Sequence, residues 1–213
     1  MINTTNHTTH IITNIHIIVT LACLGQAALA APETFDFKDP KGINNAVFKL
    51  DAPLEAINGS ATGISGTVTF DPADPGAIQG MIVVASSSLH VGNPMQLEHL
   101  RSAKWMDVAK YPQISFETKQ FKNVKTNGDT TTGDVTGTFT CKGISKEITA
   151  PVKFTFLKDK LGKRVPNMNG DLLVIRADFT IKRSDFGLMP GQMEEKVSDT
   201  IELSLSIAGA SPK

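Results

Sequence analysis

The chain has 213 residues, 40% of them hydrophobic and 20% charged, and its 21 Lys and Arg residues equal its 21 Asp and Glu residues. This balance gives no basic excess with which to hold a phosphate backbone, so nucleic acid is excluded as a partner. Length and composition indicate one ordinary globular domain.

The first 30 residues contain no Asp, Glu, Lys or Arg, and they become apolar from Ile11 up to Ala28-Leu29-Ala30. This pattern predicts a signal peptide over residues 1–30, a mature domain over 31–213, and a periplasmic or secreted protein. An uncleaved membrane anchor is the alternative, but polar residues interrupt the run short of the ~20 apolar residues that a span needs. Cys23 leaves open a lipid anchor, which its imperfect lipobox disfavours.

From Thr34 onward, apolar and polar residues alternate with a period of two, which predicts strands. Turn signals are expected at Asn58-Gly59, Pro72 to Gly76, Asn127-Gly128 and Gly162 to Gly170. Eight strands are predicted, over residues 46–57, 62–71, 78–89, 112–124, 131–142, 145–158, 171–184 and 197–208. Eight antiparallel strands can close into a barrel or form two packed sheets, and the pattern suits both. Pro151 predicts a bulge or an unpaired position.

The stretch from Met95 to Glu117 breaks the two-residue pattern. Asn93 suits a helix N-cap and Pro94 the first helical position, so a short helical insertion is predicted near residues 93–110. We expect Trp105 to pack against one end of the barrel as a lid, since it is too apolar to stay in water.

Residues 31–213 contain a single cysteine, Cys141, which continues an apolar strand face and is expected to be a small buried hydrophobe. The same residues contain only His90 and His99, which we interpret as surface residues rather than metal ligands. No nucleophile motif and no phosphate loop is present. We therefore predict no catalytic residue, no metal and no cofactor.

Arg183 falls on the predicted dry face of its strand, two residues before Asp185. A buried charge must be paired, so a pair with Asp185 is the favoured interpretation, and contact with the polar head of a ligand is the other. The predicted dry faces are also rich in aromatic residues, which can fill a core or surround an elongated cavity. The inward-facing candidates are Phe48, Phe70, Phe116, Phe139, Phe154, Phe156, Phe179, Ile181, Leu203 and Leu205.

Three segments resemble signatures of the YceI-like family, in the order expected for it. They are His99 to Ser102 with Trp105 to Phe116, Lys142 to Lys146, and Ile181 to Gly187. Two elements depart from that family: residues 52–57 stand in place of a His-Leu-Gly element, and residues 96–98 in place of an Arg-Asp pair.

The resemblance implies an all-β fold, an eight-stranded antiparallel lipocalin-like barrel that holds a polyisoprenoid lipid, either a prenyl pyrophosphate or an isoprenoid quinone. Arg183, Trp105 and Leu100 would then meet the ligand's head or form a lid. A homodimer and a membrane-associated redox partner are further expectations. The alternative is a structural or stress-protective periplasmic protein with a filled barrel that acts through a protein partner.

Overall fold

The computed structural model describes Met1 and residues 31–213, so the predicted signal peptide and Cys23 lie outside the described residues. Three helical turns, η1 (Pro75–Ala77), η2 (Ser86–Ser88) and η3 (Arg183–Phe186), and two helices, α1 (Pro94–Arg101) and α2 (Leu161–Arg164), interrupt the sheet. The strands are β1 (Glu33–Asp36), β2 (Asn45–Asp51), β3 (Ala56–Ala61), β4 (Ile64–Phe70), β5 (Gln79–Ala85), β6 (His90–Val91), β7 (Gln113–Asn127), β8 (Thr130–Cys141), β9 (Ile144–Leu157), β10 (Gly170–Lys182) and β11 (Thr200–Pro212).

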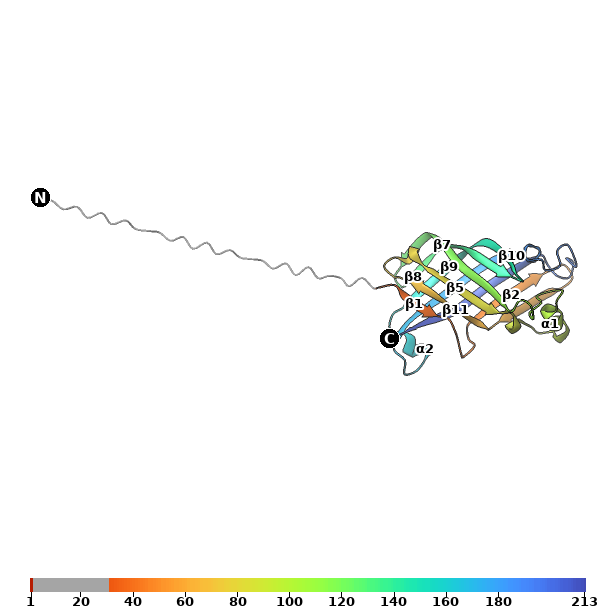
Figure 1. Cartoon of the computed structure of the whole chain (residues 1–213), viewed down its shortest axis with the longest axis horizontal. Helices are drawn as coiled ribbons and strands as arrows, with labels where there is room; N and C mark the ends of the chain where they lie inside the picture. The colour runs from red at the N-terminus through yellow and green to blue at the C-terminus, as the bar shows by residue number, and fades with distance from the viewer. Residues whose placement is uncertain (2–30) are drawn as a thin grey trace.

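The strands form one antiparallel sheet that closes on itself, and Figure 1 shows α1 and α2 at opposite ends of this barrel. Around the ring the order is β1-β4-β5-β7-β8-β9-β10-β11, and β1 pairs back onto β11. The predicted eight-stranded antiparallel barrel is therefore confirmed. We call the end beside α1 the mouth, and the end beside α2 the closed end. No helix among residues 31–213 is long and apolar enough to cross a bilayer.

One position in the ring is shared by two short strands, β1 and β2, which run in the same direction along β11. β1 meets β11 at Asp36 and Ala210, whereas β2 begins opposite Ser206. Between these points the side chain of Asn44 donates to the carbonyl of Ala208 at 3.1 Å and accepts from its N–H at 2.9 Å. This buried amide replaces a missing backbone pair and keeps the ring closed.

The predicted strand over residues 46–57 is wrong, because this segment contains most of β2, a turn and the start of β3, which pairs back onto β2. The chain reverses at residues 52–55, where the N–H of Ala52 donates to the carbonyl of Glu55 at 3.0 Å. The turn predicted at Asn58-Gly59 is also wrong, since both residues lie inside β3 and pair with residues of β2. Gly59 is needed there for close packing: a Cβ on it would lie 2.0 Å from the ring of Phe48.

The wall is incompletely paired between β9 and β10. Their ladder covers only Val152–Leu157 of β9 against Leu172–Ala177 of β10, although β8 pairs with β9 from Ile144 to Thr155. Pro151 lies immediately beyond this ladder and opposite Asp134 of β8, without a register shift. The predicted unpaired position is thus found on the β10 side, and the alternative of a bulge is wrong.

The closed end of the barrel is filled by aromatic side chains. Phe121 meets Phe154 edge-on at 5.3 Å between ring centroids, and Phe70 lies 6.0 Å from Phe154 and 6.2 Å from Phe156. Phe35, from the β1 strand that the sequence pattern did not predict, is fully buried in the same cluster. This end therefore has a packed hydrophobic floor.

A charged cluster seals the outside of that floor. Asp171 is fully buried and accepts from the Lys213 ammonium at 2.7 Å and from the Asp159 backbone N–H at 2.6 Å. Glu33 lies beside it, 3.8 Å from Lys213. Burial and the neighbouring Asp171 charge raise the pKa of Glu33, whereas hydrogen bonds from the Asp159 backbone and Lys213 lower the pKa of Asp171.

The predicted helical insertion is confirmed as α1. The Asn93 side chain accepts from the backbone N–H groups of Met95 and Gln96 at 2.9 and 3.2 Å, and so caps the helix as its sequence position predicts. Arg101 then donates to the carbonyls of Ser87 and Leu89 at 2.8 and 2.9 Å. These bonds fix the helix over the mouth.

Candidate functional site

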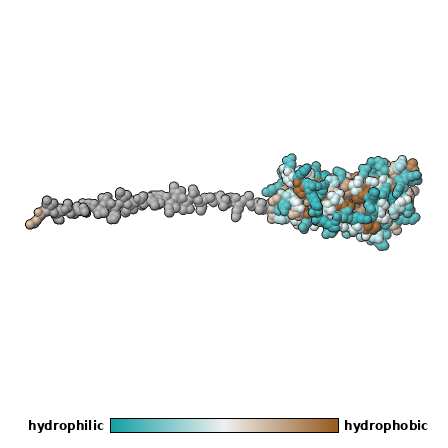
Figure 2. All heavy atoms as spheres, turned by 90° about the horizontal axis from the view of Figure 1, so that it is seen from above, coloured by the Kyte–Doolittle hydropathy of each residue, from teal (hydrophilic) through white to brown (hydrophobic). Residues whose placement is uncertain are grey.

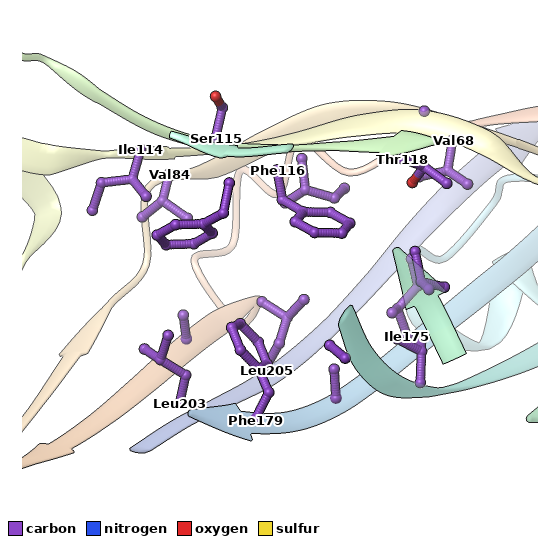
Figure 3. Close-up of a pocket in the computed structure, with 18 of the residues that line it drawn as sticks. Val68, Val84, Ile114, Ser115, Phe116, Thr118, Ile175, Phe179, Leu203 and Leu205 are labelled. Carbon is purple, nitrogen blue, oxygen red and sulfur yellow. The ribbon is translucent and has the colours of Figure 1, made fainter. Parts of the chain in front are cut away.

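The barrel is hollow above its aromatic floor. An inner cavity of about 160 Å³ lies between β7 on one side and β10 and β11 on the other. Figure 3 shows Phe116, Phe179 and Leu205 pointing into this space from opposite walls. The only side chains with polar groups on its lining are those of Ser115 and Thr118, and the Ser115 hydroxyl points away from the cavity in Figure 3. The inner cavity is therefore an apolar compartment.

An outer chamber of about 490 Å³ continues from it towards the mouth. The two spaces share five lining residues, Phe48, Leu89, Ile114, Phe139 and Leu203. The outer chamber is enclosed by α1, by the segment that follows it, and by the loop of residues 188–198. Charged, amide and imidazole side chains line only this outer chamber, so an elongated molecule would find mainly apolar walls in the barrel and charged groups only near the mouth.

Most of the predicted inward residues line these spaces. The inner cavity is lined by Phe48, Phe116, Phe139, Phe154, Phe179, Leu203 and Leu205, and the outer chamber by Leu100, Trp105, Ile181 and Arg183. Phe70 and Phe156 line neither space, because they pack in the closed end with Phe154. Phe residues that look alike in the sequence therefore have two roles: some pack together as the floor, and others line the cavity above it.

Arg183 is fully buried, and backbone carbonyls surround its guanidinium group. It donates to Leu188 at 2.6 Å and to Val197 and Ser198 at 3.2 Å each, as well as to Met189 and Gln192. All three nitrogens are thus engaged with the loop that borders the outer chamber. The charge is stabilised by backbone dipoles, and the arginine holds the loop in place.

The predicted pair of Arg183 with Asp185 is wrong. The Asp185 side chain is half exposed and lies 4.0 Å from the Lys146 ammonium. The chain leaves the strand at Arg183 and enters the η3 turn, so the two side chains no longer share a face. Strand alternation predicted the burial of Arg183 but not its partners.

Trp105 lies in the wall of the outer chamber and is partly buried. The Arg183 guanidinium carbon is 5.8 Å from the centre of its ring, a cation–π distance. The aromatic side chain therefore joins the segment after α1 to the arginine-held loop. This places Trp105 at the mouth, as the lid prediction expects.

Sequence reasoning missed the loop of residues 188–198, which contributes Leu188, Met193, Lys196 and Val197 to the outer chamber. This loop has no apolar period, and only its position after the predicted strand could have indicated it. The Lys196 ammonium lies 3.9 Å from the Glu55 carboxylate, and both side chains are about half exposed. His99 is exposed, as the sequence predicts, and it also borders the outer chamber.

Cys141 lines the outer chamber but is buried, as predicted, and burial raises its pKa to about 12. A thiol with that pKa stays protonated near neutrality and is a poor nucleophile. Within the part of the chain that the structure describes, no three His, Cys, Asp or Glu side chains are grouped so as to hold a metal ion.

The sequence motifs have structural roles at the mouth. Lys142 and Gly143 form the β8–β9 turn with positive φ angles of 48° and 75°, and Gly143 leaves room for Tyr111, whose ring would lie 2.6 Å from a Cβ there. Phe186 is buried and meets Phe139 edge-on at 5.3 Å, and Gly187 ends the η3 turn at φ 65°. These motifs shape the mouth rather than supply reacting groups.

Comparisons with known proteins agree with this architecture. Residues 41–208 match the model of the YceI-like domain. The chain is 29% identical over 155 residues to Protein YceI of Salmonella arizonae, covering 73% of this chain and 74% of that protein.

Solved structures share the fold. BcnA of Burkholderia cenocepacia superposes with a TM-score of 0.60 at 22% identity, over 78% of this chain and 94% of that one. A polyisoprenoid binding domain from Saccharophagus degradans superposes with a TM-score of 0.60 at 13% identity, over 85% of this chain and all of that one. Since the family model spans well over half of the sequence, the chain belongs to the YceI-like family.

Proposed function

We propose that this chain is an exported, non-enzymatic carrier that holds one polyisoprenoid lipid, a prenyl pyrophosphate or an isoprenoid quinone, inside the barrel. The observation that carries this proposal is the continuous apolar space that begins at an aromatic floor and ends at the mouth. The likeness to a polyisoprenoid binding domain from Saccharophagus degradans supports the same class of ligand.

The energetics favour the tail as the main source of affinity. Each methylene removed from water contributes about 0.8 kcal/mol, so a long hydrocarbon binds without specific polar contacts. The inner cavity offers such an environment, with Phe116 and Phe179 on facing walls. The ligand's far end would stop at the floor formed by Phe70 and Phe154.

The polar head is placed by this proposal in the outer chamber. Lys196, His99 and Gln96 line that chamber and are the groups that would contact the head. Arg183 would act through the loop, because its nitrogens are already engaged with carbonyls. Trp105 and Leu100 would cover the tail where it leaves the barrel.

The inner cavity and the outer chamber support the carrier over the filled-barrel alternative, because a filled barrel would leave no such space above its floor. Export, a homodimer and a membrane-associated redox partner remain predictions. For export, the intact mass of protein from the cell envelope should correspond to a chain beginning at Ala31. A mass that includes Met1 would overturn export, and a lipid-modified Cys23 would establish the lipid anchor instead.

The test of ligand binding uses delipidated full chain and a series of prenyl alcohols and quinones of increasing length. We expect saturable quenching or enhancement of the single Trp105 and one bound ligand per chain in native mass spectrometry. A Leu205→Trp variant should fill the inner cavity and lose long tails. The matched control Ser204→Trp, one residue away on the outer face of β11, should keep them. If wild type binds no member of the series, the carrier function is wrong.

A further inference from the structure

Three large apolar side chains stand exposed around the mouth. Met95 is 67% exposed, Leu54 65% and Met193 51%. They come from three separate segments: the start of α1, the β2–β3 turn and the loop of residues 188–198. Met95 and Met193 line the outer chamber, and the backbone N–H of Leu54 donates to the carbonyl of Glu195 at 2.9 Å. These residues form what we call the apolar rim.

The apolar rim is continuous with the lining of the outer chamber, which distinguishes it from isolated apolar residues elsewhere. Figure 2 shows apolar atoms reaching the barrel surface in patches between hydrophilic side chains. Isolated exposed residues such as Met81, on β5 and 44% exposed, are ordinary for a folded domain. A rim of flexible methionine and leucine side chains around a hollow opening is suited to contact with an apolar partner.

Free positive charge lies beside this opening. Lys142 donates to the carbonyl of Lys104 at 3.2 Å, and the Lys110 ammonium lies 5.2 Å from the ring centre of Tyr111, which packs on Gly143 next to Lys142. None of the ion pairs among the described residues involves Lys104, Lys110 or Lys142. We call these three lysines the basic lip.

The other side of the mouth has a different charge pattern. There, Lys196 is paired with Glu55, and the exposed Glu194 and Glu195 lie next to it in the loop. The unpaired lysines of the mouth therefore lie in the segment after α1 and in the β8–β9 turn, while α1 itself carries one exposed carboxylate, that of Glu98. Because of this uneven charge, the mouth would be attracted to an anionic surface more than to a neutral one. The side with the unpaired lysines would approach an anionic surface first.

We infer that the apolar rim and the basic lip together dock the mouth on an anionic lipid bilayer. Exposed apolar side chains enter the boundary between head groups and acyl chains, and nearby lysines are attracted to the negative surface. Docking in this orientation places the outer chamber, and through it the apolar inner cavity, against the hydrocarbon phase, so a hydrophobic molecule can pass between bilayer and barrel with little exposure to water. This surface does not depend on which molecule occupies the barrel.

Vesicle flotation of the delipidated full chain tests the inference. The vesicles are phosphatidylcholine alone and phosphatidylcholine mixed equally with phosphatidylglycerol. Wild type should partition more strongly into the mixed vesicles, and added salt should weaken this preference. The double variant Met95→Ser/Met193→Ser should bind both kinds of vesicle about tenfold more weakly. The matched control Met81→Ser should behave as wild type.

Replacing the basic lip separates charge from apolar insertion. Lys104→Gln and Lys110→Gln should each reduce binding to the mixed vesicles about fivefold at low salt, with little effect on phosphatidylcholine alone. Two control variants should have no such effect. They are Lys153→Gln, in the half of β9 away from the mouth, and Lys158→Gln, just after the end of β9. Thermal unfolding confirms that each variant is folded, which we expect because the altered side chains are exposed.

Several outcomes would overturn the inference. They are wild type that floats with neither vesicle, a methionine double variant that floats like wild type, and a Met81→Ser control that loses as much binding. Concentration-dependent dimerisation abolished by the double variant, without vesicle binding, would assign the rim to a second copy of the chain. Loss of prenyl binding in solution with intact flotation would instead count only against the carrier function.

Discussion

Replacement of Arg183 by methionine should destabilise the protein through the loop rather than through a lost ion pair. Methionine fills a similar apolar volume but donates no hydrogen bond, so five carbonyls lose the arginine as a donor, although that of Met189 still accepts from the Gln192 N–H. The bonds to Leu188 and Val197 are buried, whereas water can reach the other three more easily.

The size of the effect follows from those two buried carbonyls. An unsatisfied buried acceptor costs about 1 to 3 kcal/mol, so the pair predicts a loss of about 2 to 6 kcal/mol in the free energy of unfolding. Local opening of residues 188–198 sets an upper limit, since the loop can release its carbonyls to water. Trp105 loses its cation–π neighbour in the same variant, so its fluorescence should change.

Urea titration followed by circular dichroism and by Trp105 fluorescence measures both effects. Asp185→Asn is the matched control, because that carboxylate is half exposed and 4.0 Å from Lys146. An exposed pair of this kind is worth at most about 1 kcal/mol. Equal losses in the two variants, or an Arg183→Met variant within about 0.5 kcal/mol of wild type, would refute the assignment of Arg183 to the loop.

Four further measurements test other parts of the structure. Trp105→Ala should cost about 1 to 3 kcal/mol in urea titration, below the value for a fully buried tryptophan, and should speed ligand release; unchanged stability and release would remove it from the mouth. Phe154→Ala should cost about 3 to 5 kcal/mol and allow longer tails in the prenyl series, because it deepens the cavity at its floor; an unchanged length limit would place the floor elsewhere. Glu33→Gln should be more stable than wild type at neutral pH, because the raised pKa of Glu33 means that its ionised form weakens the fold; this advantage should disappear as the pH falls below the usual pKa of glutamate, and an advantage that grows in acid would contradict the sign. Native Cys141 should react with iodoacetamide far more slowly than urea-unfolded protein does, because burial raises its pKa to about 12; equal rates would contradict its burial.

The sequence predicted the features that depend on local pattern. The two-residue period predicted most of the strands and the burial of Cys141, and Asn93-Pro94 predicted the start of α1. The Asn127-Gly128 signal correctly indicated the β7–β8 turn, where Gly128 has a positive φ of 56°. These features follow from the preferences of a few adjacent residues.

Features that depend on long-range contacts were not predictable. β1 is four residues long, too short for a period to be recognised, and its place in the ring depends on β4 and β11. The β2–β3 hairpin preserved the alternation across its turn, so it resembled one strand. The partners of Arg183 are carbonyls, which every residue possesses, and hence no side-chain pattern could indicate them.

The partial ladder between β9 and β10 has a mechanical consequence. A closed barrel resists expansion because widening it must break backbone hydrogen bonds between strands. Towards the mouth, however, β9 residues before Val152 and β10 residues after Ala177 have no such bonds to break between them. Here the wall is joined by the buried ring of Phe186 and by the exposed Lys146–Asp185 contact. We therefore expect the barrel wall at the mouth to widen or narrow by side-chain rearrangement while the closed end keeps its shape, so that one rigid floor would serve an opening of adjustable diameter.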